Sequence, residues 1–134
     1  MLDHHRALIY TMVIVSAADS DLPDAELRII DDIVKDFPVF RDFDRHDLSR
    51  ALNDCTELMG REHGLEETLT AIKAALPAKL RETAYANACD LAAADGEASQ
   101  EELRIVELIR DRLNIDRLIA AAIERGARAR FQTL

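Results

Sequence analysis

The sequence has no tryptophan and only three prolines and four glycines among its 134 residues. Few positions therefore interrupt a helix, and the abundant Ala, Leu, Ile, Arg, Asp and Glu favour helices over strands. The two cysteines form no CxxC pair and follow no secretory signal, which indicates a reducing, cytoplasmic setting. We expect Cys55 and Cys89 to be buried as small hydrophobic side chains.

Basic residues are also scarce: the sequence has 17 Lys and Arg against 26 Asp and Glu, which gives a net charge of -9. This charge repels a phosphate backbone and argues against nucleic acid as a partner. Arg125, Arg128 and Arg130 form a small basic cluster, which we interpret as a frayed tail without a function. The apolar stretch Ala7 to Ala18 is shorter than the roughly 20 residues of a membrane span. It predicts a buried central helix and no membrane insertion.

An internal repeat is the most informative feature. Residues 13–34 (VIVSAADSDLPDAELRIIDDIV) align without gaps on residues 89–110 (CDLAAADGEASQEELRIVELIR), with eight identical pairs among 22. Chance would give about one or two identities. The repeat indicates duplication of a helix-loop-helix unit, with copies at about 4–37 and 78–113.

Each copy predicts an apolar first helix, at about 4–18 or 78–94, a short loop, and an amphipathic second helix. The second helices begin near Pro23 and Ser99, residues suited to a first turn or an N-cap. Apolar residues recur there at steps of three or four. The two predicted stripes are Leu27, Ile30, Val34 and Phe37, and Leu103, Val106, Ile109 and Leu113.

Three further helices complete the predicted fold. One is capped by Asp44 and ends near Gly60, and the next has a buried stripe of Leu65, Leu69, Ile72 and Leu76. The last is capped by Asn114 or Asp116 and fades near Gly126. We therefore predict an all-α, compact bundle of about seven helices with internal pseudo-twofold symmetry, forming one domain over residues 1–134.

The two loops carry matching acids. Asp19 and Glu26 are seven residues apart, as are Asp95 and Glu102, and Asp21 and Glu97 add one acid to each loop. An Asp at a helix C-terminus lies near the negative end of the helix dipole, which is unfavourable by about 0.3 to 1 kcal/mol. A cation bound to that Asp would make the interaction with the dipole favourable. Carboxylates and free helix carbonyls are ligands for hard ions such as calcium or magnesium. The six candidate metal ligands are Asp19, Asp21, Glu26, Asp95, Glu97 and Glu102.

A structural role explains some of these acids equally well. Ser99 and Glu102 form a predicted capping box, whereas Pro23 stands in the position of Ser99 and offers Glu26 no such partner. Arg28 and Arg104 could instead pair with the acids. The loop after Asp19 is not an EF-hand, since it lacks the Gly at position six and the Glu at position twelve.

Other chemistries have weaker support. His4 and His5 lie about 20 Å of helix from Asp19, and we expect them to be solvated. His46 and His63 show no zinc or di-iron spacing and are expected on the surface. Because no phosphate loop, nucleophile elbow or activated cysteine occurs, the sequence predicts no enzyme and no organic cofactor.

With both copies of the Ala-Ala-Asp, loop, Glu pattern identified, the sequence resembles the tellurite-resistance TerB family and the TerB-like domain of some co-chaperones. That family has duplicated Ala-Asp-Gly motifs with a Glu seven residues after the Asp, in an all-helical bundle. Asp95, Gly96 and Glu102 match directly. Asp19 and Glu26 match in the first copy, where Ser20 replaces the usual Gly. The resemblance implies a stress-response protein whose acids are proposed to bind metal and which works with partner proteins.

Two functions follow as expectations. The first is a non-enzymatic module that binds a divalent cation, with calcium, magnesium or manganese favoured over zinc, through the six acids. The second is a metal-independent protein-protein interaction module in which the acids serve as helix caps and ion pairs. The sequence leaves open the ion, the partner, the oligomeric state and whether the loops form one site or two.

Overall fold

The computed structural model describes residues 2–18, 24–94 and 98–134. Within these ranges the chain forms seven α-helices and three short 3-10 turns and no strand, which confirms the predicted all-helical class. In chain order the elements are α1 (His4–Ser16), α2 (Asp24–Asp36), η1 (Pro38–Phe40), η2 (Arg45–Asp47), α3 (Leu48–Met59), α4 (Gly64–Ala75), η3 (Ala78–Leu80), α5 (Arg81–Ala94), α6 (Gln100–Arg112) and α7 (Arg117–Arg130).

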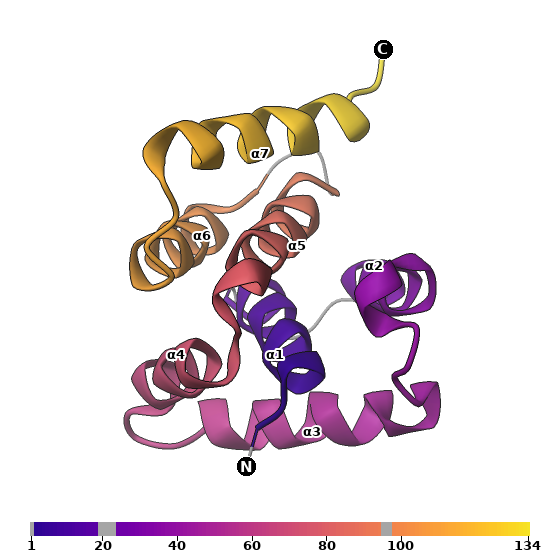
Figure 1. Cartoon of the computed structure of the whole chain (residues 1–134), viewed down its shortest axis with the longest axis vertical. Helices are drawn as coiled ribbons and strands as arrows, with labels where there is room; N and C mark the ends of the chain where they lie inside the picture. Colours follow the sequence, from indigo (N-terminus) through magenta and orange to yellow (C-terminus); the bar gives the residue numbers. More distant parts are fainter. Residues whose placement is uncertain (1, 19–23, 95–97) are drawn as a thin grey trace.

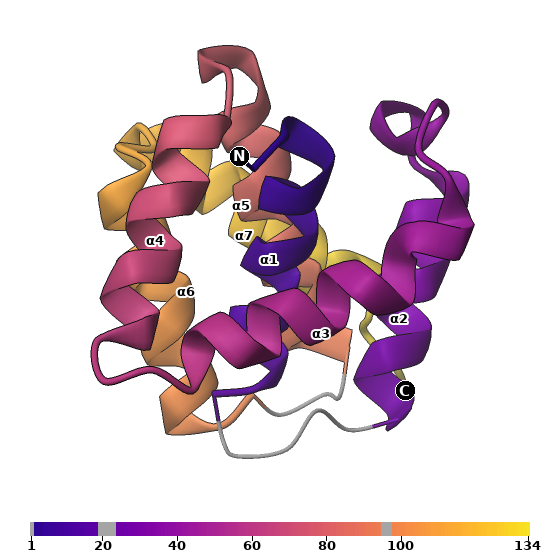
Figure 2. The same ribbon diagram turned by 90° about the horizontal axis from the view of Figure 1, so that it is seen from below.

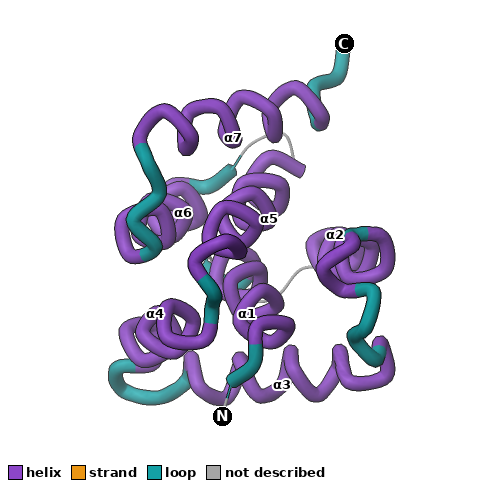
Figure 3. The backbone as a smooth tube through the Cα atoms, viewed as in Figure 1, coloured by secondary structure: helices purple, strands orange, loops and turns teal. Residues whose placement is uncertain are grey.

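Helices α1 and α5, the first helices of the two copies, pack against each other at the centre of the bundle (Figure 1). Every residue of α1 from Ala7 to Ser16 is buried, as expected for a helix that is apolar on all sides. The other five helices surround this pair, and the tube view shows short loops between most of them (Figure 3). The predicted central helix is therefore confirmed.

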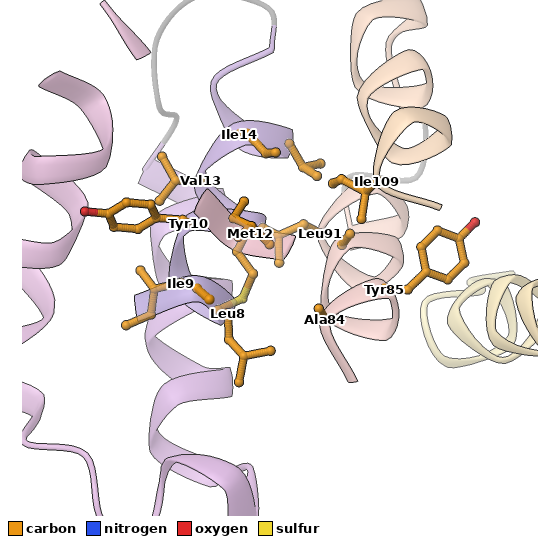
Figure 4. Close-up of a cluster of buried hydrophobic side chains, with 14 of the residues drawn as sticks. Leu8, Ile9, Tyr10, Met12, Val13, Ile14, Ala84, Tyr85, Leu91 and Ile109 are labelled. Carbon is orange, nitrogen blue, oxygen red and sulfur yellow. The ribbon is translucent and has the colours of Figure 1, made fainter. Parts of the chain in front are cut away.

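The contact between α1 and α5 combines large and small side chains. Large side chains come from both helices, Leu8 and Met12 from α1 and Leu91 from α5, while Ala84 and Ala88 are small core residues of α5; Figure 4 shows Met12 and Leu91 in the space between the two helices. All five residues are fully buried. Burying a side chain of the size of Leu or Met contributes about 1.5–3 kcal/mol, so this contact is a main source of stability.

Most predicted helix boundaries are confirmed within a few residues. Asp44 caps η2 by accepting a hydrogen bond from the His46 amide, and α3 ends at Gly60. Asp116, rather than Asn114, caps α7 by accepting bonds from two amides of its first turn. Asn114 instead adopts a left-handed conformation with φ of 54°, which reverses the chain between α6 and α7.

Leu103 departs from the predicted stripe of the second amphipathic helix. Val106, Ile109 and Leu113 are buried as expected, but 48% of the Leu103 surface is exposed. Its counterpart in the first copy, Leu27, is partly covered. Periodicity alone predicts burial of both residues, and Leu103 instead lines the hollow between α6 and α7.

The prediction that the chain frays near Gly126 is wrong. Helix α7 continues to Arg130, because Ala127 is buried against the core and the Arg130 guanidinium pairs with Asp90 of α5. Asp90 is 5% exposed, so this ion pair compensates a nearly buried charge. The basic cluster is therefore part of an ordered helix and not a loose tail.

The pairing of Arg130 with Asp90 leads to a stability prediction. We expect Arg130→Met to lower the free energy of unfolding by about 1–3 kcal/mol, because it leaves a buried carboxylate without its partner. Arg125 is exposed and makes no ion pair within the described ranges, so Arg125→Met serves as the matched control. Urea unfolding of both variants measures the difference, and equal stability of the two would contradict a structural role for the pair.

Candidate functional site

The helix ends that flank the two acidic loops lie at one end of the bundle. The C-terminal ends of α1 and α5 and the N-terminal ends of α2 and α6 gather there (Figure 2). Helix α2 contacts α5 as well as α1, and α6 contacts α1 as well as α5. The two copies are therefore interleaved, because each second helix contacts the first helices of both copies.

Each of these first turns contains a buried glutamate. Glu26 of α2 is 3% exposed and Glu102 of α6 is 5% exposed, as the adjoining apolar stripes predict. Burial of a carboxylate is costly unless hydrogen bonds or a cation compensate it. Of the six predicted metal ligands, these two are described by the structure; Asp19, Asp21, Asp95 and Glu97 lie outside the described residues.

The capping box predicted for the second copy is confirmed. The Ser99 amide donates to Glu102 Oε1 and the Glu102 amide donates to Ser99 Oγ, both at 3.1 Å. The other carboxylate oxygen, Glu102 Oε2, is also buried but accepts no hydrogen bond from any described residue. Within the described residues, capping therefore accounts for one oxygen of Glu102 and leaves the second without a hydrogen-bond donor.

Arginine pairing, the other structural explanation, has less support. Arg28 and Arg104 are exposed, and neither makes an ion pair within the described part of the chain. Both point away from the buried glutamates on their own helices, as exposed positions of an amphipathic helix do.

No group of three or more His, Cys, Asp or Glu side chains close enough to hold a metal ion occurs within residues 2–18, 24–94 and 98–134. A complete metal site built on Glu26 and Glu102 would therefore need ligands from outside these ranges. The four remaining predicted acids are the candidates that the sequence supplies.

His5 is buried, although the sequence predicts that it is solvated. His5 is 7% exposed rather than solvated, and its Nε2 lies 3.0 Å from the Val39 carbonyl and 3.1 Å from Asp42 Oδ1. Its ring also stacks on Phe40. The apolar segment that covers it, η1, follows α2 in the chain, which local periodicity could not reveal. His46 and His63 are exposed, as predicted.

Both cysteines are buried and free, as predicted. Burial raises the pKa of the Cys55 thiol and of the Cys89 thiol to about 12. Both therefore stay protonated at neutral pH, and a protonated thiol is a poor nucleophile.

A polar cluster that sequence reasoning missed borders a hollow of about 520 Å³ between α6 and α7. Tyr85 Oη donates to Glu124 Oε2 at 2.5 Å, and burial together with this carboxylate raises the pKa of Tyr85. Arg110 lies 4.0 Å from the same carboxylate. The repeat gave no signal for this cluster, because the first copy has Ile9 in the position of Tyr85 and Val34 in that of Arg110.

Among the described residues, no helix is both long and apolar enough to cross a membrane.

A duplicated helix-loop-helix unit with a buried glutamate in each second helix defines an all-helical, internally symmetric class of domain. The sequence matches the family described as "Tellurite resistance protein TerB" over residues 5–124. The chain therefore belongs to the TerB family, as its duplicated motifs suggested. No curated protein and no solved structure matches it.

The buried Glu102 Oε2, which has no donor in the part of the chain that the structure describes, leads to a second prediction. We expect Glu102→Gln to raise the free energy of unfolding of chelator-treated protein by about 1 kcal/mol, because it keeps the capping acceptor and removes a buried charge. Glu102→Ala also removes the capping hydrogen bond, and we expect it to lower the free energy of unfolding by about 1 kcal/mol.

Glu101 is exposed in the same helical turn, so Glu101→Gln controls for the change in net charge and should stay within about 0.5 kcal/mol of the wild type. Urea unfolding in the presence of chelator measures all three variants. A lower free energy of unfolding for Glu102→Gln would contradict the prediction, because it would show that other groups already stabilise the charged carboxylate in the metal-free protein.

Proposed function

We propose that this chain is a non-enzymatic TerB-type stress-response module that binds a divalent cation at the end of the bundle where the two acidic loops begin and end. The proposed ligands are Glu26 and Glu102 together with Asp19, Asp21, Asp95 and Glu97. Membership of the TerB family and the duplicated acids support this proposal.

The observation that carries the proposal is the buried Glu102 Oε2, which has no hydrogen-bond donor among the described residues. A cation would supply the missing interaction, and it would also offset the unfavourable charge of acids placed at helix C-terminal ends. The interleaving of the two copies supports a common location, because α2 and α6 each contact the first helix of the other copy.

The ligand chemistry favours calcium, magnesium or manganese over zinc. All six proposed side-chain ligands are carboxylates, and the helix ends add carbonyl oxygens. Both thiols are buried in protonated form, which makes them poor zinc ligands.

A second function is favoured by the capping box. If Ser99 and Glu102 serve only to start α6, the acids are structural and the chain is a metal-independent module that binds other proteins. Under either function we propose that the chain acts through protein partners in the cytoplasm and turns over no substrate.

The two functions differ in the response of thermal stability to metal. We expect calcium, magnesium or manganese to raise the melting temperature of chelator-treated protein in a saturable way, because an ion that binds only the folded state stabilises it. At a free concentration of about 100 times Kd the gain is about 2.7 kcal/mol. Zinc should give the smaller rise.

Two double variants test the assignment of ligands. Glu26→Gln with Glu102→Gln should abolish the metal-dependent rise while leaving helix content intact. Asp24→Asn with Glu101→Gln removes the same charge from exposed positions of the same two turns and should keep the rise. If no ion shifts the melting temperature at millimolar concentration, or if both double variants respond alike, the metal-binding proposal fails.

A further inference from the structure

Helix α7 is held by fewer apolar contacts than the central helices. All 14 of its residues are described by the structure, and two of them, Ala120 and Ala127, are buried. In α1, by contrast, every residue from Ala7 to Ser16 is buried. Because burial of apolar surface is the main source of stability, α7 is attached more weakly than the core of the bundle.

Packing around α7 is close on one side only. The helix lies at the edge of the bundle (Figure 1), and its main contact is with α5. Toward α6 the hollow of about 520 Å³ intervenes, and Leu103 on its wall is 48% exposed. On this side α7 therefore lacks the dense packing that holds a core helix in place.

Polar contacts supply the rest of the attachment to α5. Tyr85 Oη donates to Glu124 Oε2 at 2.5 Å in the middle of α7, and Arg130 in its last turn pairs with Asp90. Hydrogen bonds depend steeply on distance and angle, so a displacement of α7 as a unit breaks both contacts together.

The connection between α6 and α7 can serve as a hinge. Leu113 is buried and fixes the end of α6, and Asn114 then reverses the chain with a φ of 54°. Asp116 caps α7 by accepting hydrogen bonds from amides of its own first turn. This cap moves with α7 and does not depend on docking, so a change of backbone angles before Asp116 would move α7 without unfolding α6.

Helix α7 covers a side of α5 that carries Tyr85 and Cys89. Both residues line the hollow, and they are 1% and 6% exposed. Burial raises the pKa of the Cys89 thiol to about 12, so the covered thiol stays protonated and is a poor nucleophile. A thiol in water has a pKa of about 8.5, so removal of the cover would restore ordinary reactivity.

We propose that α7 is a lid that undocks from α5 as one unit while α1 to α6 stay folded, and that Cys89 reacts only when this lid is open. The open state is a minor population, because the closed state keeps the buried alanines and both polar contacts. The proposal does not rest on the proposed metal site, since Glu26 and Glu102 belong to helices that stay in place.

The two cysteines provide the test, because both are buried, free and protonated in the closed protein. Cys55 lies in α3, which contacts α1 and α4. An aromatic disulfide reagent reports exposure of each thiol, because a thiolate attacks it, forms a mixed disulfide and releases an aromatic thiolate. In the native whole chain we expect Cys89 to be labelled at least about tenfold faster than Cys55, since the lid opens more often than the whole protein unfolds. Peptide mass spectrometry measures both rates.

Arg130→Met tests whether the opening involves α7. It removes a pair that only the closed lid makes, so labelling of Cys89 should become about fivefold faster or more. Burial dominates the raised pKa of Cys89 and the charge of Arg130 opposes it, so loss of that charge without opening would slow labelling. Arg125→Met makes the same change at an exposed residue with no ion pair in the described ranges, and it should alter the rate by less than about twofold.

Leu69→Ala separates opening of the lid from unfolding of the whole chain. Leu69 is buried in α4, which contacts α1, α3 and α6. Loss of this core side chain favours global unfolding, so labelling of Cys55 should become about tenfold faster or more. Labelling of Cys89 should keep its rate, because the contacts of Leu69 remain intact when only the lid opens.

Three results would overturn the proposal. Equal labelling of the two cysteines in the wild type would show that α7 does not open separately. A Cys89 rate that Arg130→Met leaves unchanged or lowers would show that the reagent reaches the thiol through the hollow with α7 in place. A Cys89 rate that rises as much as the Cys55 rate in Leu69→Ala would show that the whole chain must unfold first.

Discussion

The packing of α1 against α5 is the interaction on which the rest of the structure depends. Helix α1 is buried along nearly its whole length, and Ala84, Ala88 and Leu91 of α5 are fully buried in the same core. These two helices are equivalent segments of a duplicated sequence, so their packing relates the two copies by approximate symmetry. Their C-terminal ends consequently lie at the same end of the bundle, where both acidic loops begin (Figure 2).

The same packing explains why two glutamates can be buried in an acidic protein. Each second helix contacts the first helix of the other copy as well as that of its own copy. Glu26 and Glu102, in the first turns of these second helices, are both buried. The capping box compensates part of the cost for Glu102, and a cation is the simplest group that could compensate the remainder at a site of this composition.

Features that depend on local sequence were predicted well. The apolar segment around Met12, the cap at Asp44 and the capping box at Ser99 each follow from a few adjacent residues, and the repeat indicated the symmetric arrangement. Features that depend on contacts between distant segments were not predicted. His5 is covered by a segment more than thirty residues away, and Arg130 extends α7 by pairing with Asp90, forty residues earlier. Leu103 is half-exposed at the hollow between α6 and α7, although its position belongs to the apolar stripe.

The central proposal is that a divalent cation binds at the end of the bundle that carries the first turns of α2 and α6. Paramagnetic broadening of backbone amide signals by manganese tests it most directly, because broadening reports the proximity of each amide to the ion. The account predicts saturable broadening around Glu26, Glu102 and the last turns of α1 and α5, and none in the first turns of α1 and α5. Broadening centred on exposed acids elsewhere, or spread evenly over the acidic surface, would contradict it.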